Sequence, residues 1–241
     1  MKKSLTHLPI VVAGFCKSGT TAISKCIAHC LGLEWQNEIR ECWHIDHYAK
    51  YEEPQREIQE KISETGEFIH ISDALLKKRV IKFPQGVYIP DMICDKASLI
   101  IVARDPADTI CAYLERKYDF ASLSYPIQEV FEMAKRWNYA YSSLKYVSPA
   151  DYMVVQYEDF ISNPETVLKS TCLFSGYIQQ YALPEWQNKQ ALPYFNIDAN
   201  GHPVRGVGRS ALSLSSSQIK KVSRMCQPSL NLLTHCDSNT S

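Results

Sequence analysis

The sequence has neither a net charge nor a long apolar run. Its 26 basic side chains are balanced by 26 acidic ones. No overall field therefore attracts nucleic acid or an anionic membrane, and an anionic ligand must be bound by a local cluster. No stretch approaches the ~18 apolar residues of a membrane span. Residues 1–8 are polar and do not resemble a secretory signal peptide.

The sequence also lacks any C-x-x-C pair. Its nine cysteines are an odd number, which favours neither a disulfide framework nor a zinc site. Free thiols on apolar helix faces behave as small hydrophobic groups, so a reducing compartment, the cytoplasm, is the simplest interpretation. There is no internal repeat or low-complexity linker. We therefore expect one domain over residues 1–241, with frayed tails at 1–8 and 237–241.

Predicted strands alternate with predicted helices along the chain. Short apolar, β-branched runs predict buried strands at 9–15, 79–83, 98–104 and 152–157. Helical periodicity and capping residues predict helices at 20–31, from Pro106 onward, and at 126–146, 164–174 and 215–233. This alternation predicts an α/β fold with three layers, in which helices cover both faces of a central parallel sheet.

A polar loop, residues 14–21 (GFCKSGTT), joins the first strand to the first helix. Backbone N–H groups at a helix start bind anions, and Gly19 lets the backbone approach a phosphate closely. The loop also carries three hydroxyl donors, Ser18, Thr20 and Thr21. It nearly matches a Walker A loop, but Thr20 stands where that motif has lysine. The cation is at Lys17 instead, where it can reach the bridging oxygen of a shorter, metal-free donor. A strand-to-helix turn with polar capping residues is the alternative for this loop.

Residues 17–21 (KSGTT) resemble the first motif, K-[ST]-G-T-[TR], of the sulfotransferases that use 3′-phosphoadenosine 5′-phosphosulfate (PAPS). Residues 100–108 (IIVARDPAD) resemble their second motif, in which a strand runs into R-[DN]-P-x-[DE]. The resemblance implies that Arg104 binds the 3′-phosphate, for which a planar guanidinium is suited. The alternative is a structural arginine at a strand end that pairs with Asp105 or Asp108. The family usually has a second phosphate donor, a serine, where this chain has Ala112, so that donor is missing or supplied elsewhere.

Two further stretches follow in the family's order. Residues 154–160 (VVQYEDF) resemble its Y-E-D-L segment, which implies a largely architectural role; Tyr157 is expected either at the adenine or in the core. Residues 204–210 (VRGVGRS) resemble the glycine-rich segment that the family wraps over the nucleotide phosphate. A basic surface loop is the alternative for this segment. The resemblance implies nucleotide contacts from Arg205, Gly206, Gly208 and Arg209.

The resemblance implies transfer of a sulfuryl group from PAPS, without a metal, to a hydroxyl or amine of a carbohydrate or small molecule. Lys17 is expected at the leaving oxygen, and Lys82, in a segment similar to the family's K-x-P, at the transferring group. The histidine that cytosolic members place after this lysine is absent here. Glycosaminoglycan-type members instead take a glutamate from the segment after the first helix. The resemblance to them implies Glu38 as the first candidate base, then Glu41 and His44. A solvated helix face is the alternative for all three.

Two other functions compete with this reading. A P-loop kinase would need Mg²⁺ and a carboxylate at a strand end, for which Asp105 is the best candidate. A non-catalytic relative could bind a nucleotide or a partner protein through the same fold. Thr20 in the lysine slot argues against the kinase, whereas Ala112 leaves the non-catalytic relative open.

Overall fold

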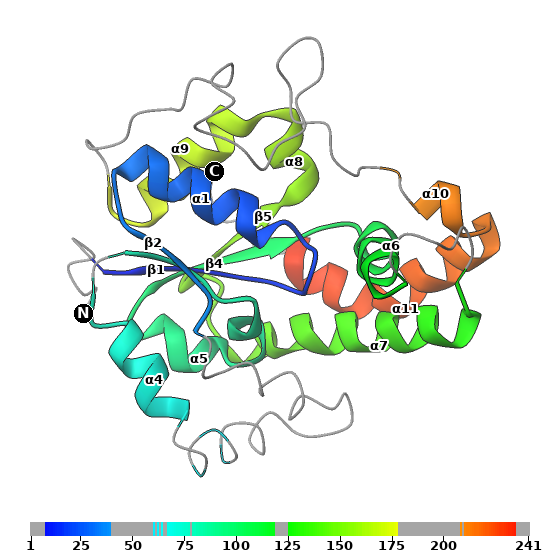
Figure 1. Cartoon of the computed structure of the whole chain (residues 1–241), viewed down its shortest axis with the longest axis horizontal. Coiled ribbons are helices and arrows are strands. Elements are labelled where there is room, and N and C mark those ends of the chain that lie inside the picture. The colour runs from blue at the N-terminus through cyan, green and yellow to red at the C-terminus, as the bar shows by residue number, and fades with distance from the viewer. Residues whose placement is uncertain are drawn as a thin grey trace.

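A parallel sheet forms the centre of the protein (Figure 1). The computed structural model describes residues 8–39, 60, 62, 64, 67–77, 79–118, 125–177, 208 and 210–234. Five strands lie in the order β2-β3-β1-β4-β5. Their bounds are Ile10–Ala13 for β1, Trp35–Asn37 for β2, Val80–Lys82 for β3, Ser98–Ala103 for β4 and Tyr152–Gln156 for β5. All four strand pairs are parallel, and the predicted α/β class is confirmed.

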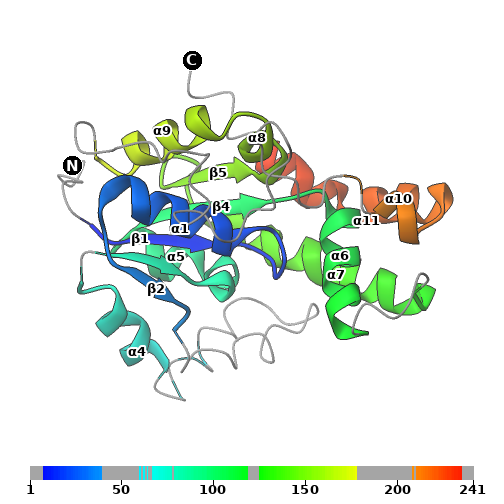
Figure 2. The same cartoon turned by 45° about the horizontal axis from the view of Figure 1, so that its top comes forward.

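Helices cover both faces of the sheet, as the two views in Figures 1 and 2 show. Ile10 and Val12 of β1 pack with the helices on one face, while Val11 and Ala13 pack on the other. Side chains alternate along a strand, so a central strand covered on both sides is apolar at every position. All four residues of β1 are buried for this reason.

One face is covered by α1, α8 and α9, whose bounds are Thr20–Leu31, Tyr157–Ser162 and Pro164–Phe174. The other face carries α4 (Glu67–Ala74), α5 (Pro90–Cys94), α6 (Pro106–Lys117), α7 (Ile127–Ser142) and α11 (Ser216–Thr234). Short helices complete the fold: 3-10 turns η2 and η3 at Pro84–Tyr88 and Ser143–Tyr146, and α10 at Ser210–Ser213. None of the described helices is both long and apolar enough to cross a bilayer.

The predicted elements differ from the structure mainly at their ends. The run expected as a strand to Tyr157 stops at Gln156, and Tyr157 begins α8. The helix expected to Tyr146 ends at Ser142 and continues as a 3-10 turn. The capping box before the last helix is present: the Gln218 side chain accepts the Ser215 N–H at 2.7 Å, and Ser215 Oγ accepts the Gln218 N–H at 3.3 Å. The three-residue β2 was not predicted.

Candidate functional site

The candidate residues gather at the carboxyl edge of the sheet. The loop with Lys17 follows β1, Glu38 follows β2, Lys82 ends β3, and Arg104 follows β4. The chain passes from β3 on one side of β1 to β4 on its other side. In an open parallel sheet, ligands bind at the carboxyl edge beside such a change of direction. The loop and Arg104 lie on the two neighbouring strands of that crevice.

The loop after β1 has the close backbone approach expected of an anion cradle. Gly19 caps α1 with a φ of 102°, and no side chain of the described residues forms a capping bond there. The N–H groups of Thr20 and Thr21, at the helix start, can therefore bind an anion. A Cβ on Gly19 would lie 2.3 Å from Cδ2 of Tyr157. Lys17 itself has a φ of 73°. Only glycine fits at position 19 beside this ring.

Tyr141 of α7 fixes the start of the loop. Its hydroxyl accepts the Phe15 N–H at 3.1 Å and donates to the Val102 carbonyl of β4 at 2.7 Å. The side chain is fully buried, and burial raises the pKa of its phenol far above the ordinary range. The sequence places Tyr141 in the apolar stripe of a helix. Its hydroxyl was the available signal, because a buried phenol must find polar partners.

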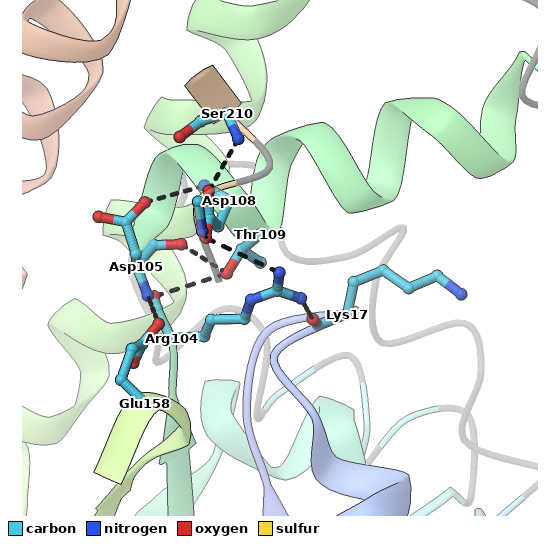
Figure 3. A network of polar contacts seen from close by, with 8 residues as sticks. Lys17, Arg104, Asp105, Asp108, Thr109, Glu158 and Ser210 are labelled. Carbon is cyan, nitrogen blue, oxygen red and sulfur yellow. Dashed lines mark hydrogen bonds and ion pairs between the residues drawn. The ribbon is translucent and has the colours of Figure 1, made fainter. Parts of the chain in front are cut away.

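Arg104 is held against the loop. Its Nη1 donates to the Lys17 carbonyl at 3.3 Å, and its Nη2 lies 4.0 Å from Asp108 Oδ2. The guanidinium carbon also stands 5.1 Å from the centre of the Tyr157 ring. In Figure 3 the Lys17 carbonyl faces Arg104 while the Lys17 side chain extends away from it. The side chains of Arg104 and Lys17 thus point in different directions from the loop backbone.

Asp108, on α6, binds the backbone at positions 208 and 210 and lies beside Arg104 (Figure 3). Its two carboxylate oxygens accept the N–H groups of Gly208 at 2.6 Å and Ser210 at 2.8 Å. The carboxylate is almost wholly buried, with a side-chain exposure of 3%. Because these bonds are charge-assisted and shielded from water, they hold position 208 close to Arg104. Sequence analysis missed this role for Asp108.

Substituting Asp108 by asparagine should therefore loosen this attachment. An amide has one acceptor oxygen, so one of the two N–H groups loses its partner, and the free energy of unfolding should fall by about 1–3 kcal/mol. Denaturant unfolding and amide hydrogen exchange at Gly208 and Ser210 measure the effect. The control is D151N, which alters an exposed carboxylate. Equal stability and exchange in the two variants would show that the attachment contributes nothing.

Lys82 and Glu38 form a close ion pair across the ends of β2 and β3. The strand register places Asn37 opposite Lys82, and Asn37 Oδ1 accepts from Lys82 Nζ at 3.4 Å. The Glu38 N–H also donates to the Lys82 carbonyl at 2.8 Å, and Glu38 has a φ of 59°. Backbone and side chain together aim the Glu38 carboxylate at the Lys82 ammonium.

Lys17, Lys82 and Glu38 line one cleft of about 1050 Å³, together with Gly19, Thr20 and Thr21 of the loop. Burial lowers the pKa of Lys17, and the neighbouring charges of Arg116 and Lys82 lower it too. The charges of Cys16 and Glu38 oppose this shift. Because burial and the neighbouring cations disfavour the charged ammonium, an anion bound in the cleft gains from pairing with it.

Comparison with known proteins decides the family. A model of the sulfotransferase domain matches residues 8–190, which is most of the chain. This chain belongs to the sulfotransferase family. No curated protein sequence matches it significantly.

The fold of this sulfotransferase resembles solved sulfotransferase structures at low identity. One from Alicyclobacillus acidocaldarius is 12% identical, with a TM-score of 0.55, and the match covers 93% of this chain and 94% of the other. One from Mycobacterium tuberculosis H37Rv is 14% identical, with a TM-score of 0.51 and coverage of 91% and 76%. A sulfotransferase domain from the curacin biosynthetic pathway is 15% identical, with a TM-score of 0.50 and coverage of 95% and 99%. These likenesses show the fold.

Several predicted site residues of the sulfotransferase either do not line the cleft or lie outside the part of the chain that the structure describes. Ser18 is fully buried within the loop and does not line the cleft. Tyr157 packs between Gly19 and Arg104 and does not line the cleft. Gly208 has a φ of 83° and is held by Asp108. The remaining predicted residues, Glu41, His44, Arg205, Gly206 and Arg209, lie outside the described residues.

Proposed function

We propose that this sulfotransferase moves a sulfuryl group from PAPS to a hydroxyl or amine of a carbohydrate or small-molecule acceptor. The observation that carries the proposal is the contact of Arg104 with the Lys17 carbonyl. It puts a guanidinium suited to a 3′-phosphate beside a loop suited to a 5′-phosphosulfate. The Gly19 backbone, with no room for a Cβ, fits a loop that a phosphate approaches closely.

The side chains of the cleft suit in-line sulfuryl transfer. Lys17 would stabilise the charge that develops on the bridging oxygen as the bond between sulfur and that oxygen breaks. Glu38 would take the proton from the acceptor hydroxyl or amine as the new bond to sulfur forms. Lys82 pairs with Glu38 and holds its carboxylate in place, and would face the transferring group. The products are the sulfated acceptor and 3′-phosphoadenosine 5′-phosphate (PAP).

The kinase alternative finds less support. Asp105, its best metal ligand, instead caps α6: its Oδ1 accepts the Asp108 N–H at 2.9 Å. The Asp105 N–H donates to Glu158 at 2.9 Å. Burial raises the pKa of both carboxyl groups. An aspartate engaged as a helix cap is a poor partner for Mg²⁺ beside a triphosphate.

Thermal unfolding in the presence of nucleotides tests the proposal. Selective binding to the folded protein stabilises it by about 2.7 kcal/mol at 100 times the Kd. We expect PAP to raise the unfolding midpoint and ATP with Mg²⁺ to leave it unchanged. A larger shift with ATP and Mg²⁺ would indicate a kinase. No shift with either would favour a relative that binds only a partner protein.

We further propose one sulfotransferase domain over residues 1–241, working in a reducing compartment, the cytoplasm. The seven cysteines that the structure describes are free thiols. Burial raises the pKa of Cys94, Cys111 and Cys226 to about 12. Thiols of this kind react slowly because they are rarely ionised, which fits a role as apolar packing groups.

A further inference from the structure

The cleft in front of the loop has a second wall that the proposed donor site does not use. Tyr113 and Arg116 of α6 line it, as do Met133 and Arg136 of α7 and Tyr88 of the 3-10 turn η2. Arg104 and Tyr157 lie outside this lining. A volume of about 1050 Å³ exceeds what a transferring group needs and is large enough for a second small molecule.

This wall carries positive charge that the described carboxylates leave unbalanced. Lys117 also lines it but is bonded to Glu129 at 2.7 Å. Among the described residues, Glu38 is the one carboxylate lining the cleft, and it is paired with Lys82. Arg116 and Arg136 have no such carboxylate partner in the part of the chain that the structure describes. They therefore present two guanidinium groups to the cleft.

The positive charge of Arg116 acts on Lys17, the residue proposed at the leaving oxygen. Burial is the largest cause of the lowered pKa of Lys17, and Arg116 is the largest of the cationic causes. Because Arg116 and Lys17 line the same cleft, a group bound by Arg116 would share that cleft with the transferred sulfuryl group. The chain as a whole has no net charge, so this concentration of cations is local. An arginine fork binds planar or tetrahedral oxyanions through two hydrogen bonds.

We propose that the acceptor is itself an anion whose carboxylate, sulfate or phosphate group is bound by Arg116 and Arg136. This rests on the proposed function, because the acceptor hydroxyl must point toward Lys17 and Glu38. The donor already has its cations, Lys17 at the phosphosulfate and Arg104 at the 3′-phosphate. Tyr88 and Tyr113 add ring surface for the body of the acceptor.

Matched pairs of acceptor probes test this inference by calorimetry on the protein saturated with PAP. The charged members are 4-hydroxyphenylacetate, 4-hydroxybenzenesulfonate and methyl glucuronide. Their neutral partners are 4-hydroxyphenylacetamide, 4-hydroxybenzenesulfonamide and methyl glucoside. We expect at least one charged member to bind about tenfold more tightly than its partner. The pair that responds distinguishes a carboxylate from a sulfonate, and a phenol from a sugar.

The variant R116Q/R136Q should lose this preference while its affinity for PAP changes little. The control K220Q/R224Q removes two exposed positive charges from α11, outside the cleft, and should keep the preference. Equal binding within every pair, or a preference that survives in R116Q/R136Q, would overturn the inference. If the wild-type protein fails to bind PAP, the proposed function fails instead. The probes are then titrated into the ligand-free protein, where the same preference and the same loss are expected.

Discussion

Replacing Lys17 by alanine should lower kcat for sulfuryl transfer by about 10²- to 10³-fold, the usual cost of removing one group that stabilises developing charge. The side chain lines the cleft and extends away from Arg104 (Figure 3), so the 3′-phosphate contact should survive. The measurement is PAP release from PAPS, with an acceptor that the wild-type protein sulfates. Binding of PAP should weaken far less than turnover.

The same variant should remain folded. The lowered pKa of Lys17 means that folding disfavours its charged form, so at neutral pH this charge lowers the stability of the protein. Removing it should leave the unfolding midpoint unchanged or raise it. The control is K169A, which alters an exposed lysine of α9. A K17A variant that keeps half of the wild-type kcat would exclude Lys17 from the chemistry.

Replacing Gly19 by alanine should lower the affinity for PAP by about 10²-fold, because the loop must shift to relieve a clash and strain. The new Cβ would meet Cδ2 and Cε2 of Tyr157 at 2.3 and 2.6 Å. Tyr157 has little room to yield, since it is buried and Arg104 stands over its ring. Calorimetric titration with PAP measures the loss.

Gly32 offers a matched control, because it also has a left-handed backbone, with a φ of 59°. Apart from its local backbone and chain neighbours, no atom of the described residues lies within 4 Å of an added Cβ. G32A should cost about 1–2 kcal/mol of stability through its backbone alone and leave PAP binding unchanged. If G19A and G32A bind PAP equally well, the close contact between Gly19 and Tyr157 plays no part in nucleotide binding.

The loop and Arg104 could be predicted because each lies in a short, contiguous stretch at the end of an apolar strand. The glycines, the lysine and the hydroxyl side chains of residues 14–21 are the groups that typically bind a phosphate or similar anion, so the stretch predicts an anion site. A parallel sheet then brings Lys17, Lys82 and Arg104 to one edge without further information. The same rule places Glu38 there once β2 is known to exist, but three residues with a tryptophan and two polar side chains give a weak strand signal.

The attachment at Asp108 and the second wall of the cleft could not be predicted in this way. Asp108 meets Gly208 across 100 residues of chain, and no local pattern encodes such a distance. Arg116 and Arg136 resemble ordinary surface charges of amphipathic helices, since periodicity shows which face of a helix is polar but not what that face confronts. Their shared cleft follows from how α6 and α7 pack, which is a property of the assembled fold.

The hydrogen bonds of Tyr141 link the proposed donor loop and β4 to α7. This helix also carries Arg136 of the proposed acceptor site. The Tyr141 hydroxyl accepts the N–H of Phe15 in the proposed donor loop. A displacement of this helix by an arriving acceptor would therefore pull on the donor cradle. By thermodynamic linkage the nucleotide must then alter acceptor affinity by the same factor. The two substrates would then bind cooperatively, because the presence of one changes the affinity of the protein for the other.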